Sequence, residues 1–565
     1  MNSVVIALAV IFIFLFAYRF YGGLIEKRVL GIDPSRPTPA HQFKDGIDYV
    51  PTRKEILFGH HFASIAGLGP IVGPAIAVVW GWVPALLWVV LGGIFFGAVH
   101  DFATNFLSLR HQGMSIGGLT EKIISRRARV LFLLIIFFVV SLAMGVFAHW
   151  VGHLFAKPLN QGGQPDAVIP VFSLIFIAII IGVLVNRAKK VGLFPATIIG
   201  LLLMFGSLWL GYKHPILGIK FEHWIYILLF YTYFASVLPV WVLLQPRDYI
   251  NSYLLFIGLF LIYLGLLVFH PRITAPALQV NIPDAPRLIP FIFIVVACGA
   301  ISGFHNLVSS GTTARQIETE KDAKFISFGG MLTESTLSVG VILACTSALL
   351  VKSSWAQEYS TWANASKLAL PHFIQGTAII LSHLGIPESL GRTLFALVVV
   401  SFAMTTLDTG TRLLRYNIEE LGKSFGSKVV AEFLGNRFVA SIFAVGAIGF
   451  FALLKVRGEP VGSVLWKLFG STNQMLAGLG LLIATLYLLF HKRPIVYTLI
   501  PMIGVMIFTS WALIIQLTGF YKNKNWALVI IGIIILIMVI WLFIEALIAL
   551  RNWLIARNSE KTASS

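Results

Sequence analysis

The chain has 565 residues, of which 58% are hydrophobic and 12% are charged, and its mean hydropathy is +0.87. In soluble domains about a quarter of the residues are charged, so this composition excludes a soluble protein and makes lipid the solvent for much of the chain. The net charge of +18 does not indicate a nucleic-acid partner, because the basic residues form short clusters between apolar runs, as in the cytoplasmic loops of membrane proteins.

The first apolar run, from Val4 to Tyr18, lacks a basic leader and a small-residue cleavage site. We therefore interpret it as a retained span and not as a signal peptide. The two cysteines, Cys298 and Cys345, lie inside apolar runs and form no CxxC motif. Neither a disulfide framework nor a metal site is expected, and no cofactor other than a coupling ion.

A helix needs about 20 apolar residues to cross a bilayer, and the chain contains about 15 such runs. We therefore predict an all-α polytopic membrane protein that has the lipid bilayer as its surroundings. The predicted spans are 3–21, 58–80, 82–107, 129–155, 168–186, 191–212, 222–244, 249–270, 287–310, 325–351, 393–411, 438–454, 468–490, 495–517 and 526–550.

A shorter apolar run at 371–385 begins with Pro371 and contains Gly376 and Gly385, and its length alone does not decide whether it spans. The charges of the loops indicate whether this run spans, because basic residues concentrate on the cytoplasmic side of a bilayer. If this run does not span, most of the basic clusters fall on one side. We therefore predict an external N-terminus, a cytoplasmic C-terminus and an external, re-entrant segment at 352–390.

Two predicted spans contain clustered helix breakers. In the span at 58–80, Pro70 and Pro74 remove donors and leave carbonyl groups near residues 66 and 70 without their usual partners. In the span at 287–310, glycines alternate with polar residues. Glycine alone would permit close helix packing, whereas unwound backbone at membrane depth needs protein or a wet cavity beside it. The breaker residues are Gly67, Gly69, Pro70, Gly73 and Pro74 in the first span and Gly299, Gly303 and Gly311 in the second, where they lie beside His305, Asn306, Ser309, Ser310, Thr312 and Thr313.

The loop charges make the two broken spans cross the bilayer in opposite directions, which is the relation that an inverted repeat requires. Interrupted spans in the two halves of a chain point to the binding site of a transporter. The pattern therefore favours a carrier whose substrate site lies between two broken helices near mid-membrane.

Polar residues in other spans add candidates. Thr405 and Thr406 would offer oxygen ligands to a small cation, although threonines in membranes also bond back to their own helix. Asp408 is expected near the cytoplasmic end of its helix, paired with Arg412 across one turn. Glu334 lies within a span, where ionisable residues are functional candidates, and we favour it for proton coupling. The same reasoning marks His60, His61, His100, Asp101, His149, His153 and His305.

Five strings carry a resemblance to a known family: HHFASIAGLGPIVGPAIAVVWGW, GGIFFGAVHDF, LLQPRDYINSYLL, GAISGFHNLVSSGTTARQI and MTTLDTGTRLLRYNIEEL. Over roughly residues 1–490 the chain resembles the bacterial carbon starvation protein A family. The resemblance implies a protein of the bacterial inner membrane that responds to starvation by taking up peptides or, in some members, pyruvate. Proton coupling is implied for the pyruvate importers.

The resemblance also implies a leucine-transporter-like inverted-repeat core with inserted helices. The span at 58–80 would be the first core helix, 287–310 the sixth and 393–411 the eighth. The corresponding division of the chain is 1–57 for an extra transmembrane helix and cytoplasmic linker, 58–212 for the first repeat, 213–286 for an inserted helix pair, 287–490 for the second repeat with its re-entrant loop 352–390, and 491–565 for peripheral helices and the cytoplasmic tail.

The breaks and the resemblance together define the expected site. Such folds hold a cation between carbonyl groups of the first core helix and hydroxyls of the eighth. The expected ion-coupling residues are Ala66, Leu68, Thr405, Thr406 and Glu334, and the expected gating residues are Arg315 and Asp408. The expected substrate-binding residues are Gly67, Gly69, Gly73, Gly303, His305, Asn306 and Ser309.

We predict a secondary active transporter that moves a small-molecule substrate, a peptide or pyruvate, by cation or proton symport and alternating access. The alternative is a membrane nutrient sensor that binds the same carboxylate solute without transporting it. A membrane enzyme is disfavoured, because the sequence has no HExxH, GxSxG or P-loop motif. Peptide or pyruvate as substrate, H⁺ or Na⁺ as coupling ion, and the oligomeric state stay open.

Overall fold

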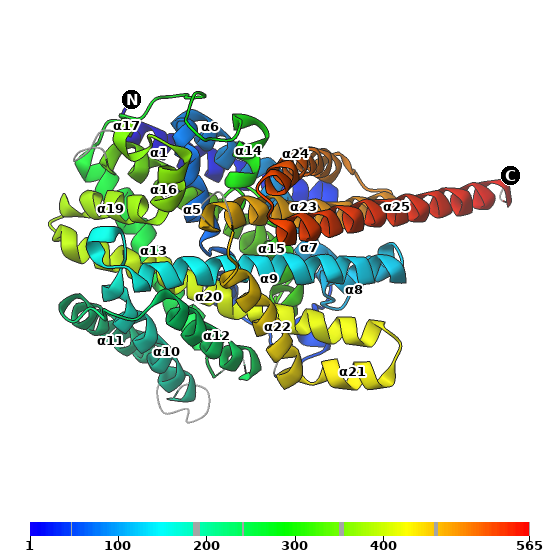
Figure 1. The fold of residues 1–565 in the computed structure, drawn as a ribbon. Coiled ribbons are helices and arrows are strands. Elements are labelled where there is room, and N and C mark those ends of the chain that lie inside the picture. Colours follow the sequence, from blue (N-terminus) through cyan, green and yellow to red (C-terminus); the bar gives the residue numbers. More distant parts are fainter. Residues whose placement is uncertain (47, 185–192, 240–241, 350–354, 457–460, 564–565) are drawn as a thin grey trace.

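The described residues of the computed structural model, 1–46, 48–184, 193–239, 242–349, 355–456 and 461–563, form helices and connecting loops without a β-strand (Figure 1). Eleven helices are long and apolar enough to cross a membrane, and two further helix pairs reach that length together across a sharp bend. The prediction of an all-α polytopic membrane protein is therefore confirmed.

The helices follow the predicted spans closely. In the first half they are α1 (Ser3–Phe16) with its continuation η1 (Ala17–Tyr21), α2 (Gly22–Leu24) and η2 (Ile25–Leu30), then α3 (Pro39–Gln42), α4 (Lys54–Ile65), α5 (Gly69–Ala77), η3 (Val78–Trp80), α6 (Trp82–Leu87), η4 (Trp88–Gly97), α7 (Ala98–Arg110), α8 (Ile116–Ile123), α9 (Arg126–Ala156), α10 (Val168–Gly182), α11 (Leu193–Lys213), α12 (Phe221–Val237) and α13 (Leu244–Phe269).

In the second half they are α14 (Leu288–Val295), α15 (Gly303–Gly311), η8 (Thr313–Arg315), η9 (Lys324–Phe328), α16 (Gly329–Leu343), η10 (Ala344–Ala348), α17 (Trp355–Glu358), α18 (Trp362–Lys367), α19 (Ala369–Ser382), α20 (Glu388–Ser424), α21 (Lys428–Gly435), α22 (Arg437–Ala452), α23 (Val461–Phe490), α24 (Val496–Lys522) and α25 (Trp526–Ala563). The predicted span ends at 186, 191 and 351 lie outside the described residues.

The run at 371–385 forms α19, an apolar helix of 14 residues. That length is too short to cross a bilayer, for which about 20 residues are needed. The helix packs against α20, η10 and α5, and the re-entrant course of 352–390 stays a prediction.

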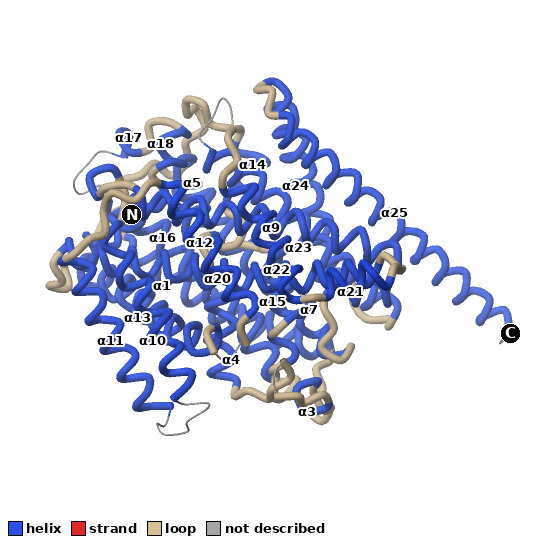
Figure 2. Tube along the Cα trace, turned by 60° about the horizontal axis from the view of Figure 1, so that its bottom comes forward, coloured by secondary structure: helices blue, strands red, loops and turns tan. Residues whose placement is uncertain are grey.

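The central helices are long and buried, whereas the peripheral ones carry large apolar side chains outward. The 37-residue helix α20 packs against α9, α12, α13, α19 and α22 (Figures 1 and 2). On α1, α24 and α25 the side chains of Phe12, Ile507 and Leu547 are 69%, 56% and 63% exposed. Such a surface is compatible with lipid and not with water. The end of α25 projects beyond the bundle in both views.

The pair α12 and α13 is tied to α20 by a buried ion pair. Arg247 of α13 and Asp408 of α20 bond directly, with side chains only 1% and 2% exposed. The Tyr231 hydroxyl of α12 donates to Asp408 at 2.6 Å and accepts from Arg247 at 2.6 Å. Charges are costly in the membrane interior unless they are paired, so these three side chains fix α12 and α13 against the core.

The predicted pairing of Asp408 with Arg412 is wrong, because Arg247 takes that place. Arg412 instead donates to the backbone carbonyl groups of Ala235, at 2.7 Å, and Leu238. The neighbour of Arg247, Asp248, reaches the other way and lies 3.0 Å from His60 of α4. The start of α13 is therefore bonded to two core helices at once.

Replacing Arg247 by leucine is expected to destabilise the protein by about 3–5 kcal/mol, because it leaves Asp408 buried without a counter-charge. The measurement is thermal unfolding of the purified protein in detergent. The double variant Arg247→Leu/Asp408→Leu should recover most of the loss, since no unpaired charge is left.

Arg53→Leu is the matched control. Arg53 lies 3.6 Å from Glu55 with both side chains mostly exposed, and an exposed pair contributes about 1 kcal/mol or less. An Arg247→Leu variant that unfolds at the same temperature as Arg53→Leu would show that the buried pair does not hold α13.

Candidate functional site

The first predicted break lies between α4 and α5. Helix α4 ends at Ile65, and Ala66 takes the non-helical conformation φ −77°, ψ 68°. After the three residues 66–68, helix α5 starts at Gly69 and runs at 50° to α4. Pro70 is the second residue of α5, where its missing N–H would have no partner in any case. The proline that follows the break therefore restarts the helix.

Pro74, inside α5, accounts for a free carbonyl one turn earlier. Its missing N–H leaves the carbonyl of Pro70 without the usual helical donor. The hydroxyl of Ser338, on α16, donates to that carbonyl at 2.9 Å. As predicted, a carbonyl near residue 70 lacks its usual donor within the helix. A side chain of another helix supplies a donor instead.

The second break is longer and separates α14 from α15 over residues 296–302. Val296, which follows α14, has φ −90° and ψ 71°, close to the conformation of Ala66 at the first break. Helix α15 begins at Gly303, where Asn473 of α23 accepts from the N–H of Phe304 at 2.9 Å. Both predicted breaks are present, and both first halves end in the same backbone conformation.

Side chains from neighbouring helices satisfy the unwound backbone of the second break. The indole N–H of Trp88 donates to the carbonyls of Phe293 and Val296 at 3.2 and 3.0 Å. Gln474 also donates to Phe293, at 2.6 Å, and Ser335 donates to Gly299 at 3.0 Å. Because irregular backbone in a membrane must find internal partners, these polar side chains are what make the break tolerable.

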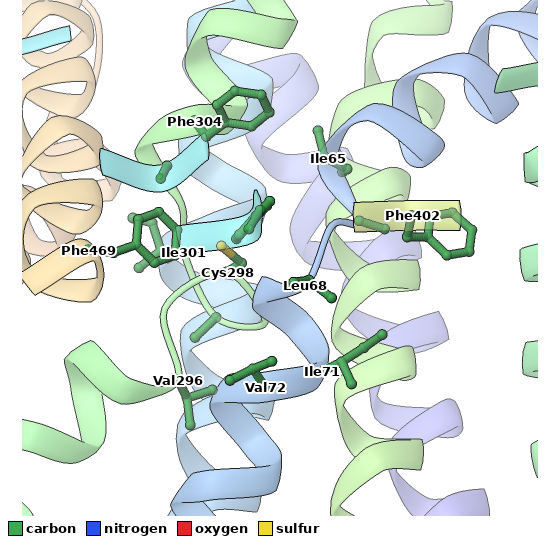
Figure 3. Packing of buried hydrophobic residues seen from close by; sticks show 14 of the residues in the cluster. Ile65, Leu68, Ile71, Val72, Val296, Cys298, Ile301, Phe304, Phe402 and Phe469 are labelled. Carbon is green, nitrogen blue, oxygen red and sulfur yellow. The ribbon is translucent and has the colours of Figure 1, made fainter. Parts of the chain in front are cut away.

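The two breaks lie against each other in the middle of the bundle. Figure 3 shows Val296, Cys298 and Ile301 of the second break beside Leu68 and Val72 of the first. All five side chains are at most 5% exposed. The contact between the opposed broken helices is therefore dry and apolar in this conformation.

The predicted glycines serve this close approach. A Cβ at Gly69 would overlap the Cys298 side chain, and a Cβ at Gly73 would overlap the carbonyl oxygen of Val295. At Gly303 it would overlap the carbonyl oxygen of Asn473, and at Gly67 it would lie 2.7 Å from the Thr406 hydroxyl. Each of these glycines thus faces protein.

A cluster of ionisable side chains, which we call the ionisable cluster, lies next to the second break and joins three helices. His305 of α15 lies 2.8 Å from Asp101 of α7 through Nδ1. Its Nε2 lies 3.2 Å from Glu334 of α16, within ion-pair distance but outside hydrogen-bond geometry. His100 lies 2.7 Å from the second Asp101 oxygen. All four side chains are fully buried.

The ionisable cluster extends toward α4. A Cβ at Gly330, one turn before Glu334 on α16, would lie 3.0 Å from the His61 ring. The other side of that ring bonds to the hydroxyl of Thr313 at 2.9 Å. Two carboxylates and three imidazoles from α4, α7, α15 and α16 thus meet in the core, and ionisable groups at such depth mark proton or substrate pathways.

The two threonines of α20 point to different neighbours. Thr406 lies at the first break, 3.5 Å from the carbonyl oxygen of Ser64. Thr405 donates to Ser401 of its own helix at 2.8 Å and accepts from Asn251 of α13 at 2.6 Å. Of the two threonines, only Thr406 thus lies at the first break, and the carbonyl group beside it is that of Ser64 and not that of Ala66 or Leu68.

A cavity of about 260 Å³ opens on the side of the basic loops. It lies between α8, α9, α15 and α20, and we call it the inner cavity. Its wall reaches Leu307 and Ser310 on α15, and Arg315 and Glu420 also line it. Arg315 donates to the carbonyl of Gly113 at 3.1 Å, so the predicted gating residue lies at this cavity, whereas Asp408 is engaged with Arg247.

On the opposite side, the segment from α17 to α19 covers α5. The hydroxyl of Tyr359 donates to the carbonyl of Ala75 at 3.1 Å. The ring of Trp362 packs on Trp80 with a centroid distance of 5.2 Å, and Trp80 is fully buried. The breaks are therefore closed off on this side.

Two predicted substrate residues keep unpaired polar atoms. The side-chain oxygens of Asn306 and Ser309 are buried and have no hydrogen-bond partner, although Asn306 also donates to the carbonyl of Leu476 at 3.2 Å. Both lie on α15, within a turn of cavity-lining residues. Of the predicted substrate residues, His305 instead joins the ionisable cluster.

Sequence reasoning missed the side chains that complete the breaks. These are Ser335 and Ser338 of α16, Asn473 and Gln474 of α23, and Trp88. The available signal was the polar string STNQ at 471–474, inside an otherwise apolar span. Uncharged polar side chains inside an apolar span are expected where they can bond to unwound backbone of a neighbouring helix.

The family model and the relatives that match this chain agree on one protein family. A family model described as "Carbon starvation protein CstA" matches residues 2–357 and 346–512. The peptide transporter CstA of Escherichia coli K12 is 33% identical over 584 residues, covering 92% of this chain and 81% of the relative. The pyruvate/proton symporter BtsT of the same organism is 31% identical over 595 residues, covering 91% and 81%.

Among solved structures, the chain is similar to a manganese transporter of Eremococcus coleocola, with a TM-score of 0.49 and 15% identity, over 90% of this chain and 99% of the other.

Replacing Gly73 by alanine is expected to destabilise the protein by about 1–3 kcal/mol, because the added methyl group forces α5 and α14 apart. The measurement is thermal unfolding in detergent, together with the yield of protein from the membrane fraction.

Gly446→Ala on α22 is the matched control. No heavy atom lies within 4 Å of a Cβ built there, and alanine in a helix interior is favoured over glycine by about 0.5–1 kcal/mol. If Gly73→Ala unfolds at or above the temperature of Gly446→Ala, the close contact between the two breaks is contradicted.

Proposed function

Because the chain belongs to the carbon starvation protein CstA family, we propose that it is a secondary active transporter that takes up a small carboxylate solute, a peptide or pyruvate, together with protons. The observation that carries this proposal is the ionisable cluster beside two opposed helix breaks. A binding site between broken helices and a buried set of titratable groups are the two components that a coupled carrier requires.

The core would work by alternating access in a leucine-transporter-like arrangement. In the present conformation the inner cavity reaches α15, while α17 to α19 cover α5. That asymmetry is the one expected of an inward-facing carrier. The opposite state would require Tyr359 and Trp362 to leave Ala75 and Trp80, and the inner cavity to close around Arg315.

The substrate would bind between the breaks and α15. The side-chain oxygens of Asn306 and Ser309 are buried polar atoms without a partner near the inner cavity, as is the amide group of Asn417, which lines it. Helices α5 and α15 begin at Gly69 and Gly303, and their positive ends attract a carboxylate. Gly69 and Gly303, together with Gly67 and Gly73, would allow the neighbouring segments to approach closely. They would not themselves contact the solute.

The ionisable cluster favours protons over sodium as the coupling ion. With His305 protonated and Asp101 and Glu334 ionised, these three groups carry one net negative charge, and one more proton makes them neutral. A buried site is most stable when its charges balance. A sodium site would need several oxygen ligands, and among the two threonines only Thr406 faces the break.

Both relatives are named as transporters, and neither name supports the sensor alternative. The chain is a multi-pass membrane protein, and we place it in the bacterial inner membrane with its N-terminus outside. The division into an N-terminal span, two repeats of the core, the inserted pair α12 and α13, and peripheral helices α24 and α25 belongs to the same proposal.

Glu334→Gln tests the coupling. In proteoliposomes with an imposed proton gradient, we expect accumulation of labelled pyruvate or dipeptide to fall at least about tenfold, equivalent to ~1.4 kcal/mol of coupling. Counterflow without a gradient should persist, because the glutamine preserves the shape of the site but binds no proton.

Glu545→Gln on the peripheral helix α25 is the control, and it should leave gradient-driven uptake unchanged. Wild-type uptake that responds to sodium alone, or a Glu334→Gln variant that still accumulates substrate with the proton gradient, would contradict proton coupling at this residue. Binding of both solutes without any counterflow by the wild type would instead support a sensor.

The orientation is testable by labelling intact cells with a membrane-impermeant maleimide. The two native cysteines are buried, so the background is low. Asn523→Cys, between α24 and α25, is expected to react from outside. Lys428→Cys, at the start of α21, should react only after the cells are opened. The reverse pattern would invert the proposed topology.

A further inference from the structure

A groove of about 510 Å³ opens between α1, α13 and α16, apart from the breaks and the inner cavity. Its floor includes Phe14 and Leu332, which are only 4% and 5% exposed. Its rim includes Leu15 and Phe260, both 64% exposed. Phe58 of α4 also lines it, so an occupant would touch the inner half of the first broken helix.

The polar side-chain groups in the walls of this groove are four hydroxyls, of Tyr18 and of three residues whose hydroxyls are already bonded. None of the lining residues is charged. The hydroxyls of Tyr263, Thr333 and Thr336 each donate to a backbone carbonyl, at 2.8, 2.9 and 2.8 Å. What remains is hydrocarbon and aromatic surface, which matches an acyl chain and not a polar solute.

A cation lies at one end of the groove. The ammonium group of Lys54 lies 5.9 Å from the ring of Phe325, which lines the groove. No carboxylate among the described residues lies within ion-pair distance of Lys54. The ammonium group of Lys324, 5.4 Å from the ring of Tyr18, is by contrast paired with Glu26 at 2.5 Å. Lys54 is thus an uncompensated charge at the mouth of an apolar groove.

We propose that this groove binds an anionic phospholipid of the cytoplasmic leaflet, with an acyl chain between α1, α13 and α16 and the phosphate at Lys54. In a bilayer the acyl chain of a lipid lies in the hydrocarbon and its anionic phosphate lies at the interface. The apolar groove would take the acyl chain, and Lys54 at its end would take the phosphate. A basic residue at the cytoplasmic surface attracts anionic lipid. The site lies apart from the proposed transport path, and only the choice of leaflet rests on the orientation proposed above.

Native mass spectrometry of the full-length protein tests this site with palmitoyl-oleoyl phosphatidylglycerol and the matched phosphatidylcholine. The wild type should retain one phosphatidylglycerol in preference to phosphatidylcholine. Lys54→Gln should weaken that binding about fivefold, the effect of one lysine at an anionic surface. Lys54→Arg should retain it.

Gly329→Leu tests the apolar part of the site. A Cβ there would lie 3.6 Å from Tyr18 and 3.7 Å from Phe58, which is ordinary contact, so the rest of the leucine side chain would fill the groove. Phosphatidylglycerol binding should fall by at least the same factor. The controls are Gly446→Leu, which has open space around it, and Lys428→Gln, an exposed lysine on α21; both should bind as the wild type does.

Three results would overturn the proposal. The first is equal retention of the two lipids by the wild type, which would indicate unspecific surrounding lipid. The second is unchanged phosphatidylglycerol binding in Lys54→Gln and Gly329→Leu. The third is a dimer without bound lipid, which would assign the groove to a second copy of the chain.

Discussion

The satisfaction of backbone hydrogen bonds at membrane depth is the constraint on which this structure depends. Two helices stop and restart inside the bundle, and hydrocarbon offers no partner for the peptide groups they release. The chain resolves this by placing a donor or acceptor from another helix at the released groups: Ser338 at Pro70, Ser335 at Gly299, and Asn473 at Phe304. The unwound segments therefore depend on α16 and α23 for their hydrogen-bond partners, and neither broken helix satisfies its own backbone.

That dependence explains how much of the fold the sequence predicts. The positions of the spans and both breaks follow from local features, namely hydropathy and the spacing of Pro70, Pro74 and the glycines. The donors that complete the breaks do not, because Ser335 and Asn473 acquire their roles only when helices distant in sequence come together. The pairing of Asp408 fails for the same reason: its local partner Arg412 was predictable, whereas Arg247 of α13 is close only in the folded chain.

The same distinction applies to the candidate site. His305, Glu334, His100 and Asp101 were each recognised singly as ionisable residues within spans, yet nothing in their spacing places them in one cluster. The structure joins them through His305, which lies between the two carboxylates of Asp101 and Glu334, whereas the sequence had suggested a substrate contact for it. The glycines were predicted to expose peptide groups to a solute. In the structure Gly69 and Gly73 face the second break, where the lack of a side chain lets the two segments approach closely.

Helix α4 connects these features. Its His60 lies 3.0 Å from Asp248 of α13, its His61 lies 2.9 Å from Thr313 in η8, and its Phe58 lines the apolar groove. The non-helical joint at Ala66 separates this half-helix from α5, which is covered by α17 to α19. A protonation change at the cluster would alter the surroundings of His61, and a lipid beside Phe58 would contact α4 one turn earlier, since residues three apart share a helix face. Since His61 and Phe58 both belong to α4, the two influences would act on a single element, which ends at the first break.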